Sequence, residues 1–420
     1  MNIFIEKIEL SDYRSCKKTI FPVNEKLSAL IGPNGSGKSN ILNGILLLKK
    51  IAKITRNRRE EEYPPSACKL KVWFNVDGHV VPYQAIVSYN TNDRNIDDVV
   101  GAEQKWNFEA FTGKKKWQTL PLSISYEIER FISDSDLSKF PSSQKMQILR
   151  SLGKLIDTNI PSNEKVFDVV NEIFRFVSGI SYYSASQFTD PSKSPTSFEI
   201  ENSKLSPRIP RSLNSEHFQF LYDVYSVYKN KSEEFDEFMS IVGRDGIGLV
   251  DNFEFNEVDV PSSFYQVFTG GRLLQKEIKK NLVIPNLTIK SVRLSPNQLS
   301  EGTFKTLGII FYLITDKSSL LLIEEPEVCV HHGLLASIVE LIKAFSQKKQ
   351  IILSTHSDFV LDEIEPENVF VVRFENQKGT IVKNIVNSMS VRDLKALKNY
   401  LETSGNLGEY WKYGDLEKWH

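Results

Sequence analysis

The sequence has few cysteines and no excess of charge of either sign. Its 420 residues include only three cysteines, Cys16, Cys68 and Cys329, and these lie far apart. An odd, sparse set of this kind argues against a disulfide framework and predicts reduced thiols. Lysine and arginine number 52 against 53 aspartates and glutamates, which leaves a formal net charge of −1. This balance argues against a generally basic nucleic-acid-binding protein, although not against a local basic patch.

Long apolar segments are also missing. The best one, LGIIFYLI at 307–314, stops at a polar Thr-Asp-Lys sequence and is far shorter than the roughly 20 residues that span a bilayer. The start of the chain, MNIFIEKIEL, alternates like a strand and lacks a signal-peptide core. We therefore predict a soluble, cytoplasmic protein that makes no membrane contact. A long heptad run is absent too, which disfavours extended coiled-coil arms.

What the sequence does contain is a phosphate-binding pattern near its start. Residues 27–50 read LSALIGPNGSGKSNILNGILLLKK, a short apolar run, a glycine-rich loop and helical apolar spacing. The loop matches G-x-x-x-x-G-K-[ST] in full, in the strand-loop-helix context that confirms such a loop. Its glycines allow backbone N–H groups to converge on phosphate oxygens. We expect Lys38 to reach the β- and γ-phosphates and the Ser39 hydroxyl to bind Mg²⁺. The predicted nucleotide-binding residues here are Gly32, Pro33, Asn34, Gly35, Ser36, Gly37, Lys38, Ser39 and Asn40.

A second pattern lies near the other end of the chain. LLLI at 320–323 is typical of a strand buried on both faces, 333–347 of a helix, and QIILST at 350–355 of the next strand. The two strands of such a unit should be parallel, with their carboxyl ends at the crevice where α/β sheets bind ligands. We expect Glu324 to hold Mg²⁺ directly or through water, and Glu325 to deprotonate the attacking water. His356, in STHSD, can contact the γ-phosphate.

Two other interpretations of this segment were weighed. Cys329, His331 and His332 are too crowded to converge on a zinc ion, and no second cysteine-histidine cluster lies nearby. The EEPE sequence could be a solvated charged turn, but the phosphate loop in the same chain favours a catalytic role. Glu327 and His331 fall in the turn before the helix, where a partner subunit could approach.

The segment NQLSEGTFKTLGIIFYLI at 297–314 begins as a polar turn and continues as a helix. Ser300 and Gly302 lie near its N-terminus, which is an anion-binding geometry. Most of the chain separates the phosphate loop from Glu324, whereas simple P-loop enzymes place these halves much closer together. A long insertion followed by a serine-glycine turn is the order found in an ABC-type head.

The motifs GPNGSGKSN, LSEGT, LLLIEEPE and ILSTHSD, in this order, resemble the ABC-type ATPases of the RecF, SMC and OLD group. The resemblance implies that two heads pack face to face and trap two molecules of ATP with Mg²⁺, in a homodimer or a higher oligomer. It also implies that Ser300 and Gly302 act in trans on the partner's γ-phosphate. The turn around Glu327 and His331 resembles the D-loop of this group.

Two weaker correspondences and two departures accompany the resemblance. Gln187, in ISYYSASQFTDPSK, resembles a Q-loop glutamine that reaches Mg²⁺ or the attacking water, although a surface glutamine after a strand is the plain alternative. Arg14 resembles an arginine that these heads place near the nucleotide. Glu324 replaces the more usual aspartate, as in the OLD-like branch. The turn VCVHHGLL replaces a common leucine-histidine-proline.

The expected fold is an α/β P-loop NTPase of the ABC-head type, with a mixed sheet lobe, an antiparallel β subdomain and a helical insertion lobe. Residues 1–126 should form the first lobe, with antiparallel strands within 69–126. Residues 127–300 should be a mostly helical insertion with a Q-loop strand near 180–190. Residues 301–386 should complete the ATPase core, and 387–420 should form a helical tail.

The chain ends too soon after ILSTHSD to hold a nuclease domain of its own. We therefore expect an ATP-driven switch that controls a separate effector, because the chain resembles ATPase subunits of bacterial anti-phage systems. The Septu ATPase has an HNH nuclease partner, and the PARIS ATPase has a Toprim nuclease partner. The alternatives are a RecF-like repair ATPase that binds DNA directly, and a scaffold that binds ATP but barely hydrolyses it. Basic stretches are few: KITRNRR at 53–59, which acidic EEE follows, and GKKKW at 113–117. GKKKW could contact a phosphate backbone, although a charged hairpin tip is the favoured interpretation.

Overall fold

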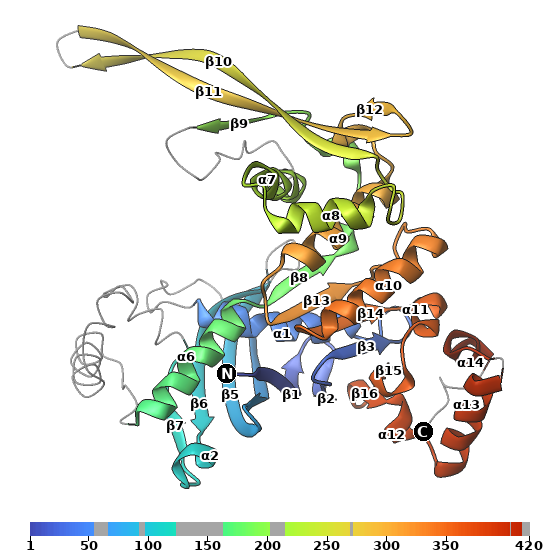
Figure 1. Ribbon diagram of the computed structural model, residues 1–420. Coiled ribbons are helices and arrows are strands. Elements are labelled where there is room, and N and C mark those ends of the chain that lie inside the picture. The colour runs from blue at the N-terminus through green and yellow to red at the C-terminus, as the bar shows by residue number, and fades with distance from the viewer. Residues whose placement is uncertain are drawn as a thin grey trace. The chain divides into compact units, whose positions relative to one another are not determined.

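The computed structural model describes residues 1–53, 66–91, 97–122, 163–201, 215–268, 272–403 and 405–413 (Figure 1). The chain divides into two compact units. Unit 1 comprises Met1–Tyr182, Lys317–Glu325 and Lys343–His420, and unit 2 comprises Tyr183–Asp316 and Pro326–Ile342. Both ends of the sequence therefore contribute to unit 1, as the motif order predicts. In the part of the chain that the structure describes, no helix combines the length and the apolar character needed to cross a bilayer.

A six-stranded mixed sheet carries the two sequence motifs. Its order is β16-β15-β3-β14-β13-β8. The strands are β3 (Leu27–Ile31), β8 (Ser181–Ser184), β13 (Leu320–Glu324), β14 (Gln350–Thr355), β15 (Val369–Glu375) and β16 (Gly379–Asn384). β3 and β14 are buried at every position, and β13 at every position but its last, so their apolar sequences follow from burial on both faces. β14 is parallel to both β13 and β3, which confirms the predicted parallel strands.

A second sheet in unit 1 is antiparallel, with the order β2-β1-β4-β5-β6-β7. Its strands are β1 (Ile3–Tyr13), β2 (Cys16–Pro22), β4 (Ser66–Val76), β5 (His79–Thr91), β6 (Asp97–Asn107) and β7 (Trp117–Thr119). The alternating sequence of β4 matches alternating burial, so strands lie within 69–126 as predicted. Aromatic side chains fill its core, where the ring centroids of Tyr83 and Trp106 lie 4.5 Å apart.

The helices of unit 1 flank these sheets or follow them in sequence. They are α1 (Lys38–Ala52), α2 (Glu109–Thr112), α6 (Glu164–Ser178), α11 (Asp358–Asp362), α12 (Ile385–Ser388), α13 (Val391–Thr403) and α14 (Leu407–Tyr413), with the 3₁₀ turn η4 (Pro366–Asn368). The Lys49 ammonium of α1 donates to the Ile180 carbonyl at 2.6 Å, just past the end of α6. α13 and α14 fall in the segment expected to be a helical tail. The KITRNRR stretch, apart from Lys53, and residues 127–162 of the insertion expected to be mostly helical lie outside the described residues.

Unit 2 combines helices with a sheet. Its helical elements are η1 (Ala185–Phe188), η2 (Pro191–Lys193), α7 (Ser215–Lys229), α8 (Glu233–Val242), η3 (Pro296–Gln298), α9 (Glu301–Thr315) and most of α10 (His332–Ser346). Its strands are β9 (Phe198–Glu201), β10 (Asn252–Phe268), β11 (Arg272–Ile289) and β12 (Val292–Leu294). α9 therefore groups with the insertion rather than with the strand that ends at Glu324.

The long antiparallel hairpin of β10 and β11 corrects the expectation of a mostly helical insertion (Figure 1). β9 pairs with residues 280–283 of β11. The sequence signal was present in NFEFNEVDV, where Phe253 and Phe255 are buried and the residues between and beside them are not. Such a period of two indicates a strand. Helices do occur over 215–242, as the helical spacing there indicates.

Candidate nucleotide-binding site

The glycine-rich loop joins the end of β3 to the start of α1. Gly35 and Gly37 have φ angles of +80° and +105°, which glycine adopts at little cost. A Cβ at Gly32 would lie 2.1 Å from the carbonyl oxygen of Val372. Three glycines of the motif are therefore required by backbone conformation or by close packing, which explains the loop without reference to a ligand.

The loop also has features that suit an anion. The Lys38 ammonium donates to the carbonyl oxygens of Gly32 at 2.6 Å and of Pro33 at 3.3 Å, and this residue is only 5% exposed. As far as the structure describes the chain, no side chain caps the N-terminus of α1, and its first turn holds no acidic residue. The first N–H groups of a helix lack intrahelical partners and carry positive potential. A cradle of this kind fits a phosphate chain.

Hydrogen bonds tie the back of the loop to two turns that are distant in sequence. Asn40 Nδ2 lies 2.6 Å from Ser15 Oγ, and Ser15 Oγ lies 2.7 Å from Thr380 Oγ1. Thr380 Oγ1 lies 3.0 Å from the Ser36 carbonyl oxygen. The turn that carries Arg14, at a φ of +49°, is thereby attached to the phosphate loop and α1. Sequence reasoning missed Ser15 and Thr380, because nothing local in their sequence points to a partner hundreds of residues away.

Parallel strand register brings the acidic segment to the same sheet edge as the loop. Ser354 of β14 pairs with Leu30 on one side and with Glu324 on the other. The carboxyl ends of β3, β14 and β13 therefore lie side by side, at the edge where such sheets bind ligands. The phosphate loop follows β3 directly, and His356 follows β14 directly.

Glu325 and His356 meet at this edge. The Glu325 N–H donates to the Ser354 carbonyl oxygen at 2.9 Å, and Glu325 has a φ of +48°. A non-glycine residue in this region costs of order 1–3 kcal/mol and persists where its surroundings fix it. The distance between Glu325 Oε1 and His356 Nδ1 is 3.7 Å, and both side chains are partly exposed. A carboxylate and an imidazole so placed can share a proton or orient a water molecule.

Glu324 has a partner that the sequence did not reveal. The hydroxyl of Tyr182, on β8, donates to Glu324 Oε2. A glutamate is one methylene longer than the aspartate that is more usual at this position, and the hydrogen bond from Tyr182 limits the conformational freedom of the Glu324 side chain. Ser39 and Glu324 offer oxygen ligands of the type that Mg²⁺ prefers. Among the residues that the structure describes, no three histidine, cysteine or acidic residues gather into a metal site, so any Mg²⁺ here depends on phosphate and water for its other ligands.

The remaining predicted residues belong to unit 2. Ser300 is exposed and is the N-cap of α9, where its Oγ accepts the Thr303 N–H at 3.2 Å. This cap alone accounts for a serine at the position. A Cβ at Gly302 would lie 2.3 Å from the Cys329 carbonyl oxygen, so the helix start packs tightly on the turn after Pro326.

Other contacts in unit 2 are local. Gln187 Oε1 accepts the Ser184 N–H at 3.2 Å as part of a capping box in η1. His331 Nδ1 accepts the Gly333 N–H at 3.3 Å at the start of α10. The Glu301 carboxylate lies 2.6 Å from the buried Lys305 ammonium, and this ion pair lowers the pKa of Glu301. Such contacts explain why the turns are ordered, and they assign no role in chemistry.

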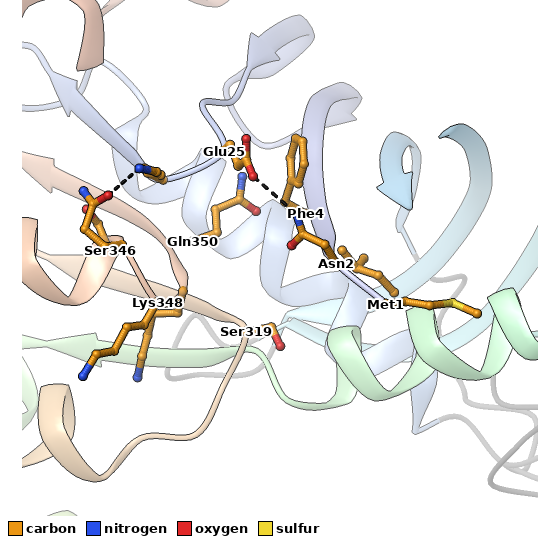
Figure 2. Close-up of a pocket in the computed structure, with 12 residues that line it drawn as sticks. Met1, Asn2, Phe4, Glu25, Ser319, Ser346, Lys348 and Gln350 are labelled. Atoms are coloured by element: carbon orange, nitrogen blue, oxygen red, sulfur yellow. Dashed lines mark hydrogen bonds between the residues drawn. The ribbon is translucent and has the colours of Figure 1, made fainter. Parts of the chain in front are cut away.

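A cavity of about 280 Å³ lies elsewhere in unit 1 (Figure 2). It is lined by Glu25, Ser319 and Gln350, among others, at the amino ends of β3, β13 and β14. Figure 2 shows Gln350 beside Asn2 and Glu25, and its side-chain amide bonds to the backbone of Ile5. The phosphate loop follows the carboxyl end of β3. This cavity is therefore at the opposite end of the sheet and is not the nucleotide site.

The sequence and the fold were compared with known proteins. A model of the family described as "AAA domain, putative AbiEii toxin, Type IV TA system" matches residues 96–362, more than half of the chain. The chromosome partition protein Smc of Methanocaldococcus jannaschii is 44% identical over 59 residues, which are 14% of this chain and 5% of that protein. The chain thus spans a small fraction of that relative's length.

Several solved structures are similar in fold. The SMC head domain from Thermotoga maritima has a TM-score of 0.43 at 13% identity, over 91% of this chain and 98% of that one. An SmcHead bound to the C-winged helix domain of ScpA has a TM-score of 0.47 at 16% identity, over 93% and 99%. An Smc head domain with an extended coiled coil, derived from Pyrococcus furiosus and bound to the C-terminal domain of ScpA, has a TM-score of 0.43 at 14% identity, over 96% and 100%.

Proposed function

The chain belongs to this AAA-domain family, and from that premise we propose that it is an ATPase that hydrolyses ATP with Mg²⁺ at the carboxyl edge of the mixed sheet. One observation carries the proposal. The register of β3, β14 and β13 supports a single site. The phosphate loop follows β3, His356 follows β14 and Glu324 is the last residue of β13, and these three strands are adjacent and parallel. The three cysteines are reduced thiols, which fits a reducing, cytoplasmic setting.

The residues of this edge divide the chemistry among them. The N–H groups of residues 34–39 and the Lys38 ammonium bind the phosphates, while Ser39 and Glu324 would hold Mg²⁺. The ion, when bound, neutralises charge that develops on the phosphate oxygens. Glu325 orients the attacking water and accepts its proton. His356, 3.7 Å from Glu325, fixes that carboxylate and donates to a γ-phosphate oxygen.

A second copy of the chain completes the site in this proposal. Ser300 is exposed at the N-terminus of α9, where the positive potential of a helix start attracts an anion, so its hydroxyl is accessible to a partner's γ-phosphate. Gly302 allows the close packing that places this helix start. ATP binding would then favour face-to-face pairing and hydrolysis would favour separation, which couples nucleotide state to quaternary structure. We propose that this switch regulates a separate effector, an HNH or Toprim nuclease, in defence against phage.

A second candidate is a RecF-like repair ATPase that binds DNA itself. It is favoured by the turn after α2, where Lys114, Lys115 and Lys116 are exposed beside Trp117, which is 45% exposed. Cations with an exposed aromatic ring suit a nucleic-acid backbone and its bases. Affinity for duplex DNA that falls steeply with salt, and that is lost when the three lysines become alanine, would favour this candidate.

The test of the proposed function is nucleotide-dependent pairing. The purified chain is mixed with ATP and Mg²⁺, or with a non-hydrolysable analogue, and its mass is measured by light scattering. We expect pairing with the analogue and dissociation after ATP turnover, and neither in Lys38→Ala. An unchanged mass in all nucleotide states would contradict the two-copy site, and the absence of hydrolysis would contradict the whole proposal.

A further inference from the structure

Four groups from three distant segments of unit 1 form one chain of hydrogen bonds behind the phosphate loop. It runs from the Asn40 amide to the Ser15 hydroxyl, then to the Thr380 hydroxyl and to the Ser36 carbonyl, at 2.6, 2.7 and 3.0 Å. Thr380 is fully buried, and Ser36 is 2% exposed. Ser15 and Asn40 are half-buried. A partly buried chain of this kind is well ordered when every member is satisfied.

The direction of the chain follows from its two ends. The Asn40 N–H group can only donate, and the Ser36 carbonyl can only accept. Each hydroxyl has one proton, so the Thr380 proton must go to Ser36. The Ser15 proton must then go to Thr380, and Ser15 accepts from Asn40. Loss of either hydroxyl interrupts the chain at a defined point.

The last bond fixes a peptide plane in the loop. In a planar trans peptide, the carbonyl and the N–H of the next residue point in opposite directions. Because the Ser36 carbonyl points at Thr380, the Gly37 N–H points away from Thr380. The approach is close, since a Cβ at Gly37 would lie 2.1 Å from Thr380 Oγ1. We propose that Thr380 is a positioning residue for the phosphate loop, which holds the Gly37 N–H ready for the phosphate chain of a nucleotide.

The backbone of Thr380 is anchored independently of its hydroxyl. Its N–H donates to the Ser15 carbonyl oxygen at 2.9 Å, and its carbonyl accepts the Thr19 hydroxyl at 2.6 Å. Valine has the same shape and the same β-branching. Thr380→Val therefore removes the bond to Ser36 while leaving the β15–β16 turn in place, and Thr380→Ser retains the bond.

This inference rests on the proposed nucleotide site. The experiment measures the affinity for ATP and ADP by calorimetry, the KM and kcat of ATP hydrolysis, and the midpoint of thermal unfolding without nucleotide. We expect Thr380→Val to weaken ATP and ADP binding about tenfold, equivalent to ~1.4 kcal/mol, with KM raised more than kcat is lowered. Thr380→Ser should stay within about twofold of the wild type, because it restores the donor. Thr112→Val is the matched control, since its hydroxyl also donates to a backbone carbonyl, that of Phe108 at 2.9 Å, away from the loop.

A role that is only structural would lower the thermal midpoint of both valine variants and leave nucleotide affinity unchanged. Wild-type affinity in Thr380→Val would therefore overturn the inference while the proposed function stands. A wild-type chain that binds no ATP would overturn both. If Thr380→Val does not fold, Thr380→Ala serves instead, because it also removes the donor to Ser36. We expect it to weaken ATP binding in the same direction, and unchanged affinity there would also overturn the inference.

Discussion

Replacement of Glu325 by glutamine separates ATP binding from ATP hydrolysis in this account. Glutamine keeps the length and shape of the side chain but accepts no proton at neutral pH. The backbone should hold its place, because the Glu325 N–H is bonded to Ser354 and its φ of +48° is fixed by the strand end. The substitution therefore removes a base with little change in geometry.

The size of the effect follows from this role. A positioned general base contributes about 10²- to 10⁴-fold, or ~3 to 5 kcal/mol of barrier. We expect Glu325→Gln to lose that much in single-turnover hydrolysis, with ATP affinity within about threefold of the wild type. The substitution also weakens the contact between Glu325 and His356, which are 3.7 Å apart. Because both groups are partly exposed, this loss should change the free energy of unfolding little.

The assay is rapid-quench single turnover with excess enzyme, beside calorimetric binding of ATP. Glu363→Gln is a suitable control, since Glu363 follows α11 and is not part of the site. Hydrolysis at the wild-type rate in Glu325→Gln would remove Glu325 from its role as base. If Glu325→Gln loses both ATP binding and turnover, the Glu325 carboxylate stabilises the phosphate loop and does not act as the base for the attacking water.

Three further outcomes test other parts of the site. Tyr182→Phe removes the hydroxyl that orients Glu324. Loss of this hydrogen bond, worth about 1 kcal/mol, should raise the Mg²⁺ concentration for half-maximal hydrolysis by about fivefold. An unchanged Mg²⁺ titration would mean that Glu324 needs no such support. Ser300→Arg should abolish pairing in light scattering while each chain still binds ATP, and unchanged ATPase activity would rule out a site shared between copies. Gly37→Ala combines an unfavourable φ of +105° with a steric clash, and it should weaken ATP binding at least about tenfold in calorimetry. Gly78→Ala, at a φ of +83° with open space around it, is the control for backbone strain alone. Equal ATP affinity in the two variants would contradict the assignment of Gly37 to the nucleotide site.

Local patterns were sufficient for the parts of the site that are continuous in sequence. The strand, loop and helix around Lys38, and the strand that ends in Glu324, have the structure that their sequences predict. Each depends on one short segment with strong preferences: glycines at positive φ, or apolar residues buried on both faces. Their juxtaposition was also predictable, because parallel strands place their carboxyl ends at one edge.

The groups that support these residues were not predictable. Thr380 and Tyr182 act through single hydrogen bonds to Ser36 and to Glu324, across long stretches of sequence. A hydroxyl in a strand has many potential partners, and only the tertiary structure selects one. The hairpin of β10 and β11 was missed for another reason. In β10 the buried alternation is limited to Phe253 and Phe255, and residues 256–261 are exposed.

The most direct test of the central claim is a crystal structure of the chain with Mg²⁺ and a non-hydrolysable ATP analogue. We expect its phosphates to lie on residues 32–39, with the Glu325 carboxylate facing the γ-phosphate and Ser300 of a second copy on the opposite side. An analogue bound elsewhere, for example in the cavity beside Gln350 in Figure 2, would contradict the account. So would phosphates on the loop with Glu325 turned away from them.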